Sequence, residues 1–404
     1  MRLIFGLIGI CCFWTMQAQS PMADGKGKFL GNVYSNAQLQ DFETYWNQVT
    51  PENAGKWGSV ERTRDSYDFA ALDAAYKFAK DNGFVFRYHV LVWGNQQPSW
   101  IEDLPEDEQL AEITEWMDTL AARYPGIDYL EVVNEPINDP PNGAGNGNYL
   151  KALGGTGTTG FDWMVTAFTM AKERFPNAKL MMNEYNIVNS ASRSNIYIKI
   201  AKILMDKGLL DVVGVQAHAF STTADADGMK AILDNISSET GLPMMVTEMD
   251  IDGPTDDEQL QQYQRIFPVF WEHPSIIGVT LWGFRPGLWR NEQKAYLIDT
   301  DGSERPAMKW LIDYIDNYNP NTPLAVSSQK LVVYPNPVKD GVLGFSSPNM
   351  VLTVKIFDLK GATILEKSNI KSKEFRLDFN ADPGTYLVKV STQLDSTTYK
   401  IIVE

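Results

Sequence analysis

The stretches Val133-Asn134-Glu135-Pro136 and Val246-Thr247-Glu248-Met249-Asp250 each place a glutamate at the end of a short apolar run. The two glutamates lie 113 residues apart (248 − 135). A β-strand followed by a helix takes about 30 residues or more, so this gap corresponds to roughly three βα units. Strands n and n+3 of a closed eight-stranded barrel lie nearly opposite each other, with their carboxyl ends on one face. The spacing therefore predicts two carboxylates that meet across a cleft at that face.

Short, β-prone apolar runs recur along the chain and support such a barrel. They are Phe29–Val33, Tyr45–Val49, Phe84–Trp93, Tyr129–Val133, Leu180–Asn183, Val212–Ala217, Met244–Thr247 and Ile276–Trp282. Segments with apolar residues three and four apart predict helices between most of them and after the last. These are Phe69–Asp81, Glu108–Tyr124, Phe161–Phe175, Ile196–Lys207 and Pro306–Tyr318. Alternating strands and helices indicate a parallel sheet, and eight strands favour an α/β fold of the closed (β/α)8 TIM barrel type over a doubly wound sheet.

The 404 residues are enough for this barrel and one small module. Residues 1–19 predict a secretory signal peptide, since a positive charge precedes an apolar stretch too short to span a bilayer. Residues 26–318 are expected to form the catalytic barrel, and residues 319–330, rich in Pro, Asn, Ser and Thr, a linker. Residues 331–404 are expected to form a small all-β immunoglobulin-like sandwich. Its predicted strands are Leu331–Tyr334, Val354–Phe357, Glu374–Phe379, Thr385–Val390 and Thr398–Val403.

Composition excludes several classes of function. The net charge of −16, without a basic cluster, disfavours binding to nucleic acid or to an anionic membrane surface. Both cysteines, Cys11 and Cys12, fall in the signal segment, which excludes disulfides, thiolate metal sites and cysteine nucleophiles from the mature protein. Only three histidines are present, one of them remote, and this argues against a catalytic zinc site. The 11 tryptophans and 17 tyrosines suit the apolar faces of sugars, although core packing accounts for about half of them.

The two glutamates predict the chemistry of a glycosidase. Alternate residues of a strand share a face, so Glu248 and Asp250 should point the same way, as should Gln216 and His218. An imidazole between two carboxylates would keep Glu248 ionised, as a nucleophile requires. Burial and the charge of Glu248 would raise the pKa of Glu135 and make it the acid.

The neighbouring sequence predicts the positions of two further ionisable residues and of one glycine-rich segment. Glu184 ends another strand and is expected to support the site, and His273 is expected at the surface. The glycine-rich stretch 142–160 is either a mobile rim loop or a simple solvated loop.

Several motifs resemble those of glycoside hydrolase family 10, whose typical members are endo-β-1,4-xylanases on a (β/α)8 barrel. Thr50-Pro51-Glu52-Asn53-Ala54-Gly55-Lys56-Trp57 is similar to the family's TPEN-x-x-KW segment, and His89-Val90-Leu91-Val92-Trp93 to its HTLVW strand end. The resemblance implies catalytic roles for Glu135 (acid/base) and Glu248 (nucleophile), supported by Asn134, His218 and Asp250. It further implies that the substrate contacts Asn53, Lys56, His89, Trp93, Gln96, Gln216, Trp282 and Trp289.

Two departures from the family's pattern affect the shape of the cleft. Gly94 stands where the family usually has a second histidine. The segment between Trp282 and Trp289 is one residue shorter than usual and contains Arg285, which is expected to form a surface salt bridge or to contact a substituent. Both glutamates are unaffected, so the departures bear on the preferred xylan.

The tail resembles the C-terminal sorting domain of type IX secretion in Bacteroidetes, through Val333-Tyr334-Pro335-Asn336-Pro337 and residues 383–388 (Pro-Gly-Thr-Tyr-Leu-Val). This implies export across the outer membrane by that machinery, followed by release or attachment at the surface; release is the prediction.

Together these observations predict a secreted or cell-surface endo-β-1,4-xylanase that is monomeric, retains anomeric configuration and needs no metal or cofactor. Its partners would be xylan or xylo-oligosaccharides and the type IX machinery, with no nucleic acid. Two alternatives stay open. One is another retaining β-glycanase, such as a cellulase or a mixed-linkage xylanase, and the other is a surface glycan-binding protein without turnover.

Overall fold

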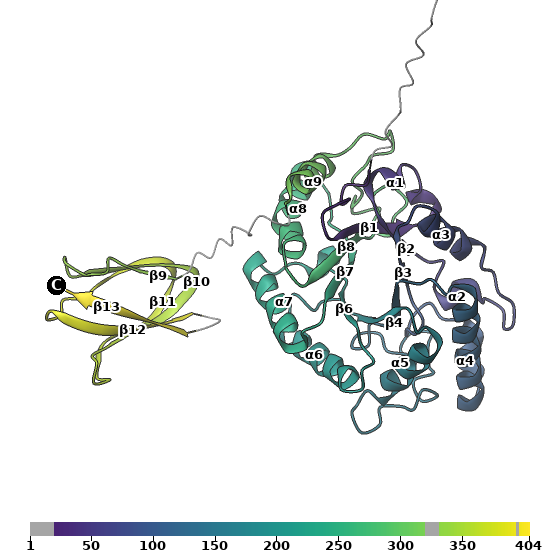
Figure 1. Cartoon of the computed structure of the whole chain (residues 1–404), viewed down its shortest axis with the longest axis horizontal. Helices are drawn as coiled ribbons and strands as arrows, with labels where there is room; N and C mark the ends of the chain where they lie inside the picture. Colours follow the sequence, from purple (N-terminus) through teal and green to yellow (C-terminus); the bar gives the residue numbers. More distant parts are fainter. Residues whose placement is uncertain (1–19, 320–330, 393–395) are drawn as a thin grey trace, which may run out of the picture. The chain divides into compact units, whose positions relative to one another are not determined.

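The computed structural model describes residues 20–319, 331–392 and 396–404. The chain divides into two compact units, residues 1–319 and 320–404 (Figure 1). The predicted signal peptide, and the predicted linker from residue 320 onward, lie outside the described residues.

The first unit is a closed parallel barrel. Its strands are β1 (Phe29–Tyr34), β2 (Gln48–Pro51), β3 (Val85–Tyr88), β4 (Tyr129–Asn134), β5 (Lys179–Asn183), β6 (Val212–Val215), β7 (Met244–Met249) and β8 (Ile276–Leu281). Each strand pairs with the next in sequence, and β8 pairs in parallel with β1 to close the ring. The predicted (β/α)8 barrel is confirmed, and Figure 1 shows its helices outside the ring of strands.

The helices of the barrel include one at each of the five predicted helical segments, with ends within five residues of those predicted. They are α1 (Phe42–Tyr45), α2 (Trp57–Val60), α3 (Ala70–Asp81), α4 (Glu106–Arg123), α5 (Asp162–Arg174), α6 (Ala191–Met205), α7 (Ala226–Thr240), α8 (Asp256–Trp271) and α9 (Pro306–Asn317), with short 3-10 turns at Asn36–Gln38, Ser99–Asp103 and Ala219–Ser221. Their apolar faces pack on the strands and their polar faces meet water.

Two predicted strands of the barrel are wrong by three residues or more at one end. Tyr45 ends helix α1 instead of opening a strand, because Tyr45 and Trp46 pack as aromatic core residues around Phe284. The run from Phe84 to Trp93 is strand only from Val85 to Tyr88. Beyond Tyr88, Leu91 and Val92 still hydrogen-bond to β4 as an isolated bridge, and the segment carries His89 and Trp93 into the cleft described below.

Polar side chains fill the interior of the barrel below its carboxyl end. Thr280 donates to Gln48 (2.7 Å), Gln48 donates to Thr50 (2.8 Å), and Arg87 donates to Thr50 (3.1 Å). Arg87 also forms an ion pair with Glu131, and both side chains are fully buried. Because Thr280 on β8 and Gln48 on β2 are not on neighbouring strands, their contact crosses the inside of the barrel. These hydrogen bonds satisfy groups that would otherwise be costly to bury.

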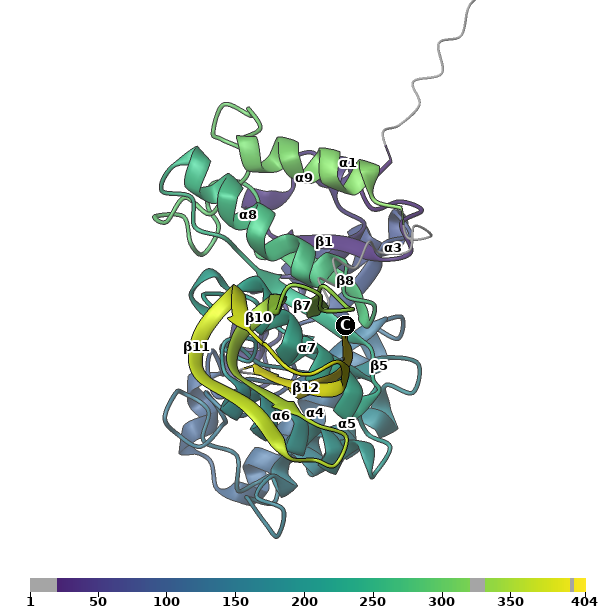
Figure 2. The same ribbon diagram turned by 90° about the vertical axis from the view of Figure 1, so that its left-hand side faces the viewer.

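The second unit is an antiparallel all-β domain, so the predicted all-β class is confirmed. Its strands are β9 (Val332–Tyr334), β10 (Val342–Phe357), β11 (Thr363–Asp378), β12 (Gly384–Thr392) and β13 (Ser396–Val403). Hydrogen bonds join them in the order β11-β10-β12-β13, and β9 pairs with the first half of β10. The register of β10 shifts between Ser346 and Val351, after which β12 takes the place of β9 as its partner. Figure 2 shows β10 and β11 as long, bent strands.

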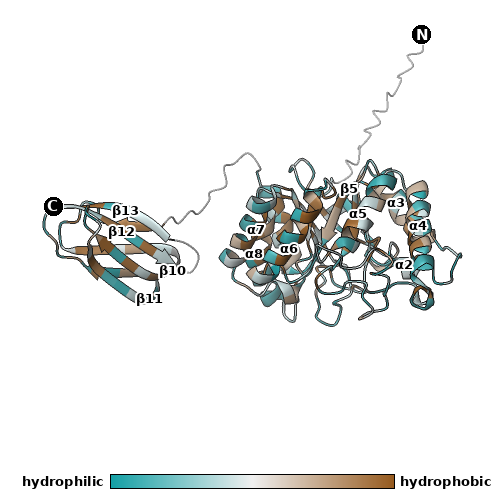
Figure 3. Ribbon diagram, turned by 90° about the horizontal axis from the view of Figure 1, so that it is seen from below, coloured by the Kyte–Doolittle hydropathy of each residue, from teal (hydrophilic) through white to brown (hydrophobic). Residues whose placement is uncertain are grey.

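Hydrophobic and hydrophilic residues alternate along the strands of this second unit (Figure 3). The inward residues, among them Phe345, Ile356, Val388 and Ile401, form a core of their own. In the described part of the chain, no helix is long and apolar enough to cross a membrane.

Candidate active site

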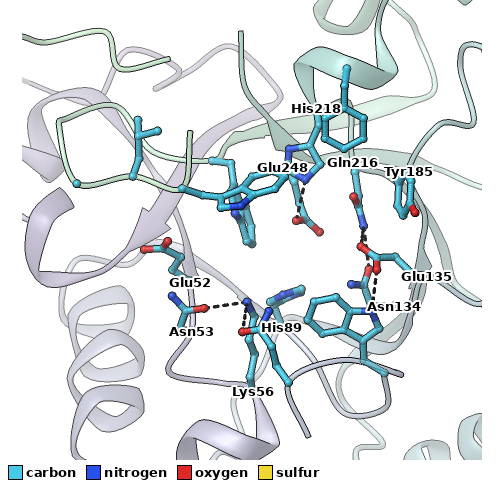
Figure 4. A pocket seen from close by; sticks show the side chains of 17 residues that line it. Glu52, Asn53, Lys56, His89, Asn134, Glu135, Tyr185, Gln216, His218 and Glu248 are labelled. Atoms are coloured by element: carbon cyan, nitrogen blue, oxygen red, sulfur yellow. Dashed lines mark hydrogen bonds and ion pairs between the residues drawn. The ribbon is translucent and has the colours of Figure 1, made fainter. Parts of the chain in front are cut away.

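A cleft of about 620 Å³ opens at the carboxyl ends of the barrel strands, as the spacing of the two glutamates predicts. It is lined by Glu52, Asn53, Lys56, His89, Trp93, Gln96, Asn134, Glu135, Tyr185, Gln216, His218, Phe220, Glu248, Trp282, Gly287, Leu288 and Trp289. Every predicted site residue except Asp250 is in this lining. Figure 4 shows Glu135 and Glu248 pointing into the same space from different elements.

Glu135 follows strand β4 and is held at both carboxyl oxygens. The indole Nε1 of Trp93 donates to Oε2 (2.7 Å), and the amide of Gln216 donates to Oε1 (2.7 Å). Only 8% of the residue is exposed. Burial raises the pKa of Glu135 to about 8; the hydrogen bond from Gln216 opposes this rise, and the charge of Glu248 adds to it. The carboxyl is therefore protonated at neutral pH, as a general acid must be.

Glu248, on strand β7, has the opposite protonation state. Burial alone disfavours its charge, but hydrogen bonding and the charge of His218 outweigh that penalty and lower its pKa. His218 Nε2 lies 3.4 Å from Glu248 Oε2, and the side-chain amide of Asn183 donates to Oε1 (2.7 Å). The carboxylate is thus ionised and fixed in direction, as a nucleophile requires.

Asp250 lies behind His218 rather than on the cleft wall. Its Oδ2 is 2.6 Å from His218 Nδ1, and its Oδ1 accepts from the backbone of Ala219 (2.8 Å). Burial favours the neutral imidazole, but Asp250 and Glu248 together raise the pKa of His218 to about 10. The ring is therefore a cation between two carboxylates, and it orients Glu248.

The side of the cleft formed by the loops after β2 and β3 carries cationic and amide groups. Lys56 Nζ donates to Asn53 Oδ1 (2.8 Å) and to Gln96 Oε1 (3.1 Å). His89 Nδ1 lies 3.1 Å from Glu131 Oε1, and burial lowers the pKa of His89 well below its usual value. The imidazole is therefore neutral, with its Nε2 left for another partner. These groups suit the hydroxyls of a neutral sugar.

Aromatic rings from the segments after β6 and β8 form another wall of the cleft. Trp282 is buried, whereas Trp289 and Phe220 are 55% and 45% exposed. Phe220 stacks on His218 at 5.4 Å between ring centroids, and Trp289 meets the same imidazole edge-on at 4.7 Å. Exposed rings at the mouth of a cleft suit the apolar faces of sugar units.

Several residues of the site are missed by sequence reasoning. Glu52 lies inside the quoted TPEN-like segment, and Tyr185 directly follows a strand-end glutamate. The sequence could therefore have indicated that both lie at the cleft. Phe220 stands in a short helical turn, and Asn183 reaches Glu248 from strand β5. Nothing in their local sequence indicates these contacts.

Burial and hydrogen-bond partners show where the structure places three further residues, Glu184, His273 and Arg285. Glu184 is fully buried and binds the loop after Glu135, accepting from the backbone of Ile137 (2.8 Å) and from the Asn138 amide (2.7 Å). His273 is only 3% exposed, so its predicted surface position is wrong; Ser275 and Asp234 hold it. Arg285 is also buried and pairs with Asp41 (2.7 Å) outside the cleft lining.

Two groups of side chains among the described residues have the spacing of a cation site: His89, Glu131 and Glu248, and Glu61, Asp65 and Glu112. In the first, Arg87 and Asn183 already donate to the carboxylates. In the second, Arg64 is paired with Glu112. Protein donors thus supply much of what a cation would provide.

Residues 20–314 match glycosyl hydrolase family 10. The chain belongs to this family. Residues 332–404 match a secretion system C-terminal sorting domain, in agreement with the resemblance of the tail.

Named relatives of this family 10 chain cover mainly its barrel. Endo-1,4-beta-xylanase B of Cellvibrio japonicus is 40% identical over 287 residues, which is 71% of this chain but only 45% of that protein. Beta-1,4-xylanase of Dictyoglomus thermophilum is 33% identical over 62% of this chain and 74% of its own length. Among solved structures, xylanase 10B of Thermotoga maritima matches with a TM-score of 0.62 and 26% identity, over 73% of this chain and 96% of that one.

Proposed function

We propose that this protein is a retaining endo-1,4-β-xylanase that hydrolyses internal bonds of xylan by double displacement. The observation that carries the proposal is the pair of carboxyl groups in one cleft with opposite pKa shifts, upward for Glu135 and downward for Glu248. Two such groups, one protonated and one ionised, are what a retaining glycosidase needs. Membership of family 10 and the xylanase names of its relatives supply the substrate class.

In the first step the Glu248 carboxylate attacks the anomeric carbon while Glu135 gives its proton to the glycosidic oxygen. The carbon–oxygen bond breaks, the leaving chain departs as an alcohol, and a glycosyl-enzyme ester remains. In the second step Glu135, now ionised, takes a proton from water, and that water displaces Glu248. Two inversions restore the β configuration, a course that needs carboxyl groups about 5 to 5.5 Å apart.

The other lining residues bind and orient the sugar in this proposal. Asn134 lies beside Glu135, and its Oδ1 accepts from Gln216 (3.1 Å) and Asn183 (3.2 Å). In the proposed complex its Nδ2 donates to the 2-hydroxyl of the sugar under attack. Asn53, Lys56, His89 and Gln96 hold the glycone side. Trp93, Trp282 and Trp289 enclose the ring.

The sorting domain directs the enzyme to the type IX secretion machinery, and we propose release outside the cell after passage across the outer membrane. Release there would give the enzyme access to polymeric xylan.

The proposal is tested by proton NMR of the purified protein acting on xylohexaose. We expect β-anomer at new reducing ends before mutarotation, and α-anomer first would remove Glu248 as nucleophile. Cleavage of cello-oligosaccharides or mixed-linkage substrates in preference to xylohexaose would favour another β-glycanase. Binding without any cleavage would favour a glycan-binding protein.

The pH dependence of kcat/KM follows from the two carboxyl groups. Glu248 must be ionised, so activity is lost as the pH falls through its lowered pKa, and Glu135 must be protonated, so activity is lost as the pH rises through about 8. Gln216→Ala removes a donor that favours ionised Glu135, so we expect the alkaline limb to move to higher pH by roughly half to one unit.

The matched control is Gln259→Ala, since Gln259 is equally buried but binds backbone carbonyls away from the cleft. Its alkaline limb should stay at the parent's position. A limb that does not move in Gln216→Ala would mean that another group titrates there.

A further inference from the structure

Tyr149, in the connection between β4 and α5, is fully buried and binds both backbone polar groups of Trp93. Its hydroxyl accepts from the Trp93 N–H (3.2 Å), and its proton is shared between the Trp93 carbonyl (2.9 Å) and Gln97 Oε1 (2.6 Å). The ring packs edge-on against Trp57 at 6.0 Å. A single side chain thus fixes residue 93 on both sides of its Cα.

Glycines bring the same connection into backbone contact with the segment after β3. Gly94 N–H donates to the Asp139 carbonyl (3.0 Å), and Gly147 N–H donates to the Gly94 carbonyl (3.0 Å). A Cβ at Gly94 would lie 2.3 Å from the Asp139 oxygen and 2.4 Å from the Pro140 oxygen. A Cβ at Gly147 would lie 2.9 Å from the Trp93 oxygen. The backbone of the connection therefore occupies the space that a side chain at position 94 would need.

Both sets of contacts hold the backbone of Trp93, whose indole is hydrogen-bonded to the acid Glu135. Trp93 donates through Nε1 to Glu135 Oε2 at 2.7 Å, while Gln216 holds the other oxygen. The direction of an indole follows from the backbone that bears it, because rotamers are set relative to the backbone. A looser backbone at residue 93 would misplace the donor and, through it, the Glu135 carboxyl. Misplacement by about 1 Å can cost up to 100-fold in rate.

We propose that Tyr149 is a positioning residue for the proton-transfer steps, acting on Glu135 through Trp93. Tyr149 is not among the residues that line the cleft. The inference rests on the proposed glycosidase function and adds a residue outside the family-like motifs to it.

The test is Tyr149→Phe, which keeps the ring and removes the hydroxyl. We expect kcat on xylohexaose to fall about tenfold with KM nearly unchanged, because the loss concerns orientation in the transition state. The alkaline limb of the kcat/KM profile should move upward, since a poorly placed indole no longer favours ionised Glu135. Formation of the glycosyl-enzyme from 2,4-dinitrophenyl xylobioside, whose leaving group needs no proton, should fall less than twofold.

Tyr124→Phe is the matched control, because Tyr124, at the end of α4, is also buried but donates to Asp73 on α3, away from the cleft. It should lower thermal stability without changing the pH profile or the ratio of rates on the two substrates. A Tyr149→Phe enzyme that behaves like Tyr124→Phe overturns the proposal. A parent that cleaves neither substrate would instead overturn the proposed function.

Gly147→Ala also disturbs the backbone of Trp93, but without removing the Tyr149 hydroxyl. It keeps the test decisive if Tyr149→Phe is poorly folded. Its methyl group presses on the Trp93 carbonyl, so the same upward shift and the same selective loss on xylohexaose are expected. A Gly147→Ala enzyme with the parent's profile also counts against positioning through Trp93.

Discussion

Glu248→Ala is expected to lower kcat/KM on xylohexaose by at least about 10⁴-fold, the scale at which loss of a covalent nucleophile acts. Without this carboxylate no glycosyl-enzyme can form. The loss should be in turnover rather than in binding, because Asn53, Lys56 and the aromatic wall stay in place. Initial rates, together with xylohexaose affinity measured by calorimetry, separate the two effects.

The nucleophile can also be identified directly. A 2-fluoro-xylobioside that forms a slowly hydrolysed ester should add its mass to the peptide containing Glu248 in the parent and leave Glu248→Ala unlabelled. Glu61→Ala is the matched control, since Glu61 is equally buried but binds Trp57 and the backbone of Asp65 outside the cleft lining. Label on any other residue would contradict the proposed mechanism.

Glu135→Ala is expected to reduce xylohexaose hydrolysis by roughly 10² to 10⁴-fold, the usual contribution of general acid–base catalysis. With 2,4-dinitrophenyl xylobioside the first step no longer needs the acid, so a burst of dinitrophenolate should precede a slow steady state. The second step remains slow because no base activates water. Stopped-flow absorbance measures both phases.

Azide distinguishes the roles of the two glutamates by stereochemistry. In Glu135→Ala it should attack the glycosyl-enzyme, accelerate the steady state and give β-xylobiosyl azide. In Glu248→Ala it should occupy the space of the lost carboxylate and give the α-azide in one displacement. Exchange of these two products between the variants would show that the roles are reversed.

The fold was predictable where one physical rule governs a long segment. Alternating strands and helices with apolar periodicity indicate the barrel regardless of detail, and the closure between β8 and β1 follows from the number of strands. The bounds at Tyr45 were not predictable, because an aromatic pair buried against Phe284 is as apolar as a strand. In the second unit, residues 342–353 of β10 and residues 363–373 of β11 were missed. Gly341, just before β10, and Gly344 within it interrupt the apolar pattern and resemble a turn.

The site was predictable where spacing or a family-like motif placed residues together. The two glutamates were assigned from their strand ends and spacing together with the family-like motifs, and His218 was expected between carboxylates, where the structure places it. Asn183 and Tyr149 were not found, because each acts on a partner in a different element. Such contacts depend on how the barrel curves and how its loops cross, which local composition does not specify.

The polar interior of the barrel limits how this enzyme can be engineered. Replacing a buried ion pair by well-packed hydrophobic residues of similar volume is often neutral or stabilising by about 1 to 4 kcal/mol. Here Arg87 and Glu131 connect the lower interior to Asn183, which holds Glu248, so repacking that layer would also alter the nucleophile's surroundings. Thermostabilising redesign is better directed to the helices outside the barrel, where gains in stability need not be offset by lost turnover.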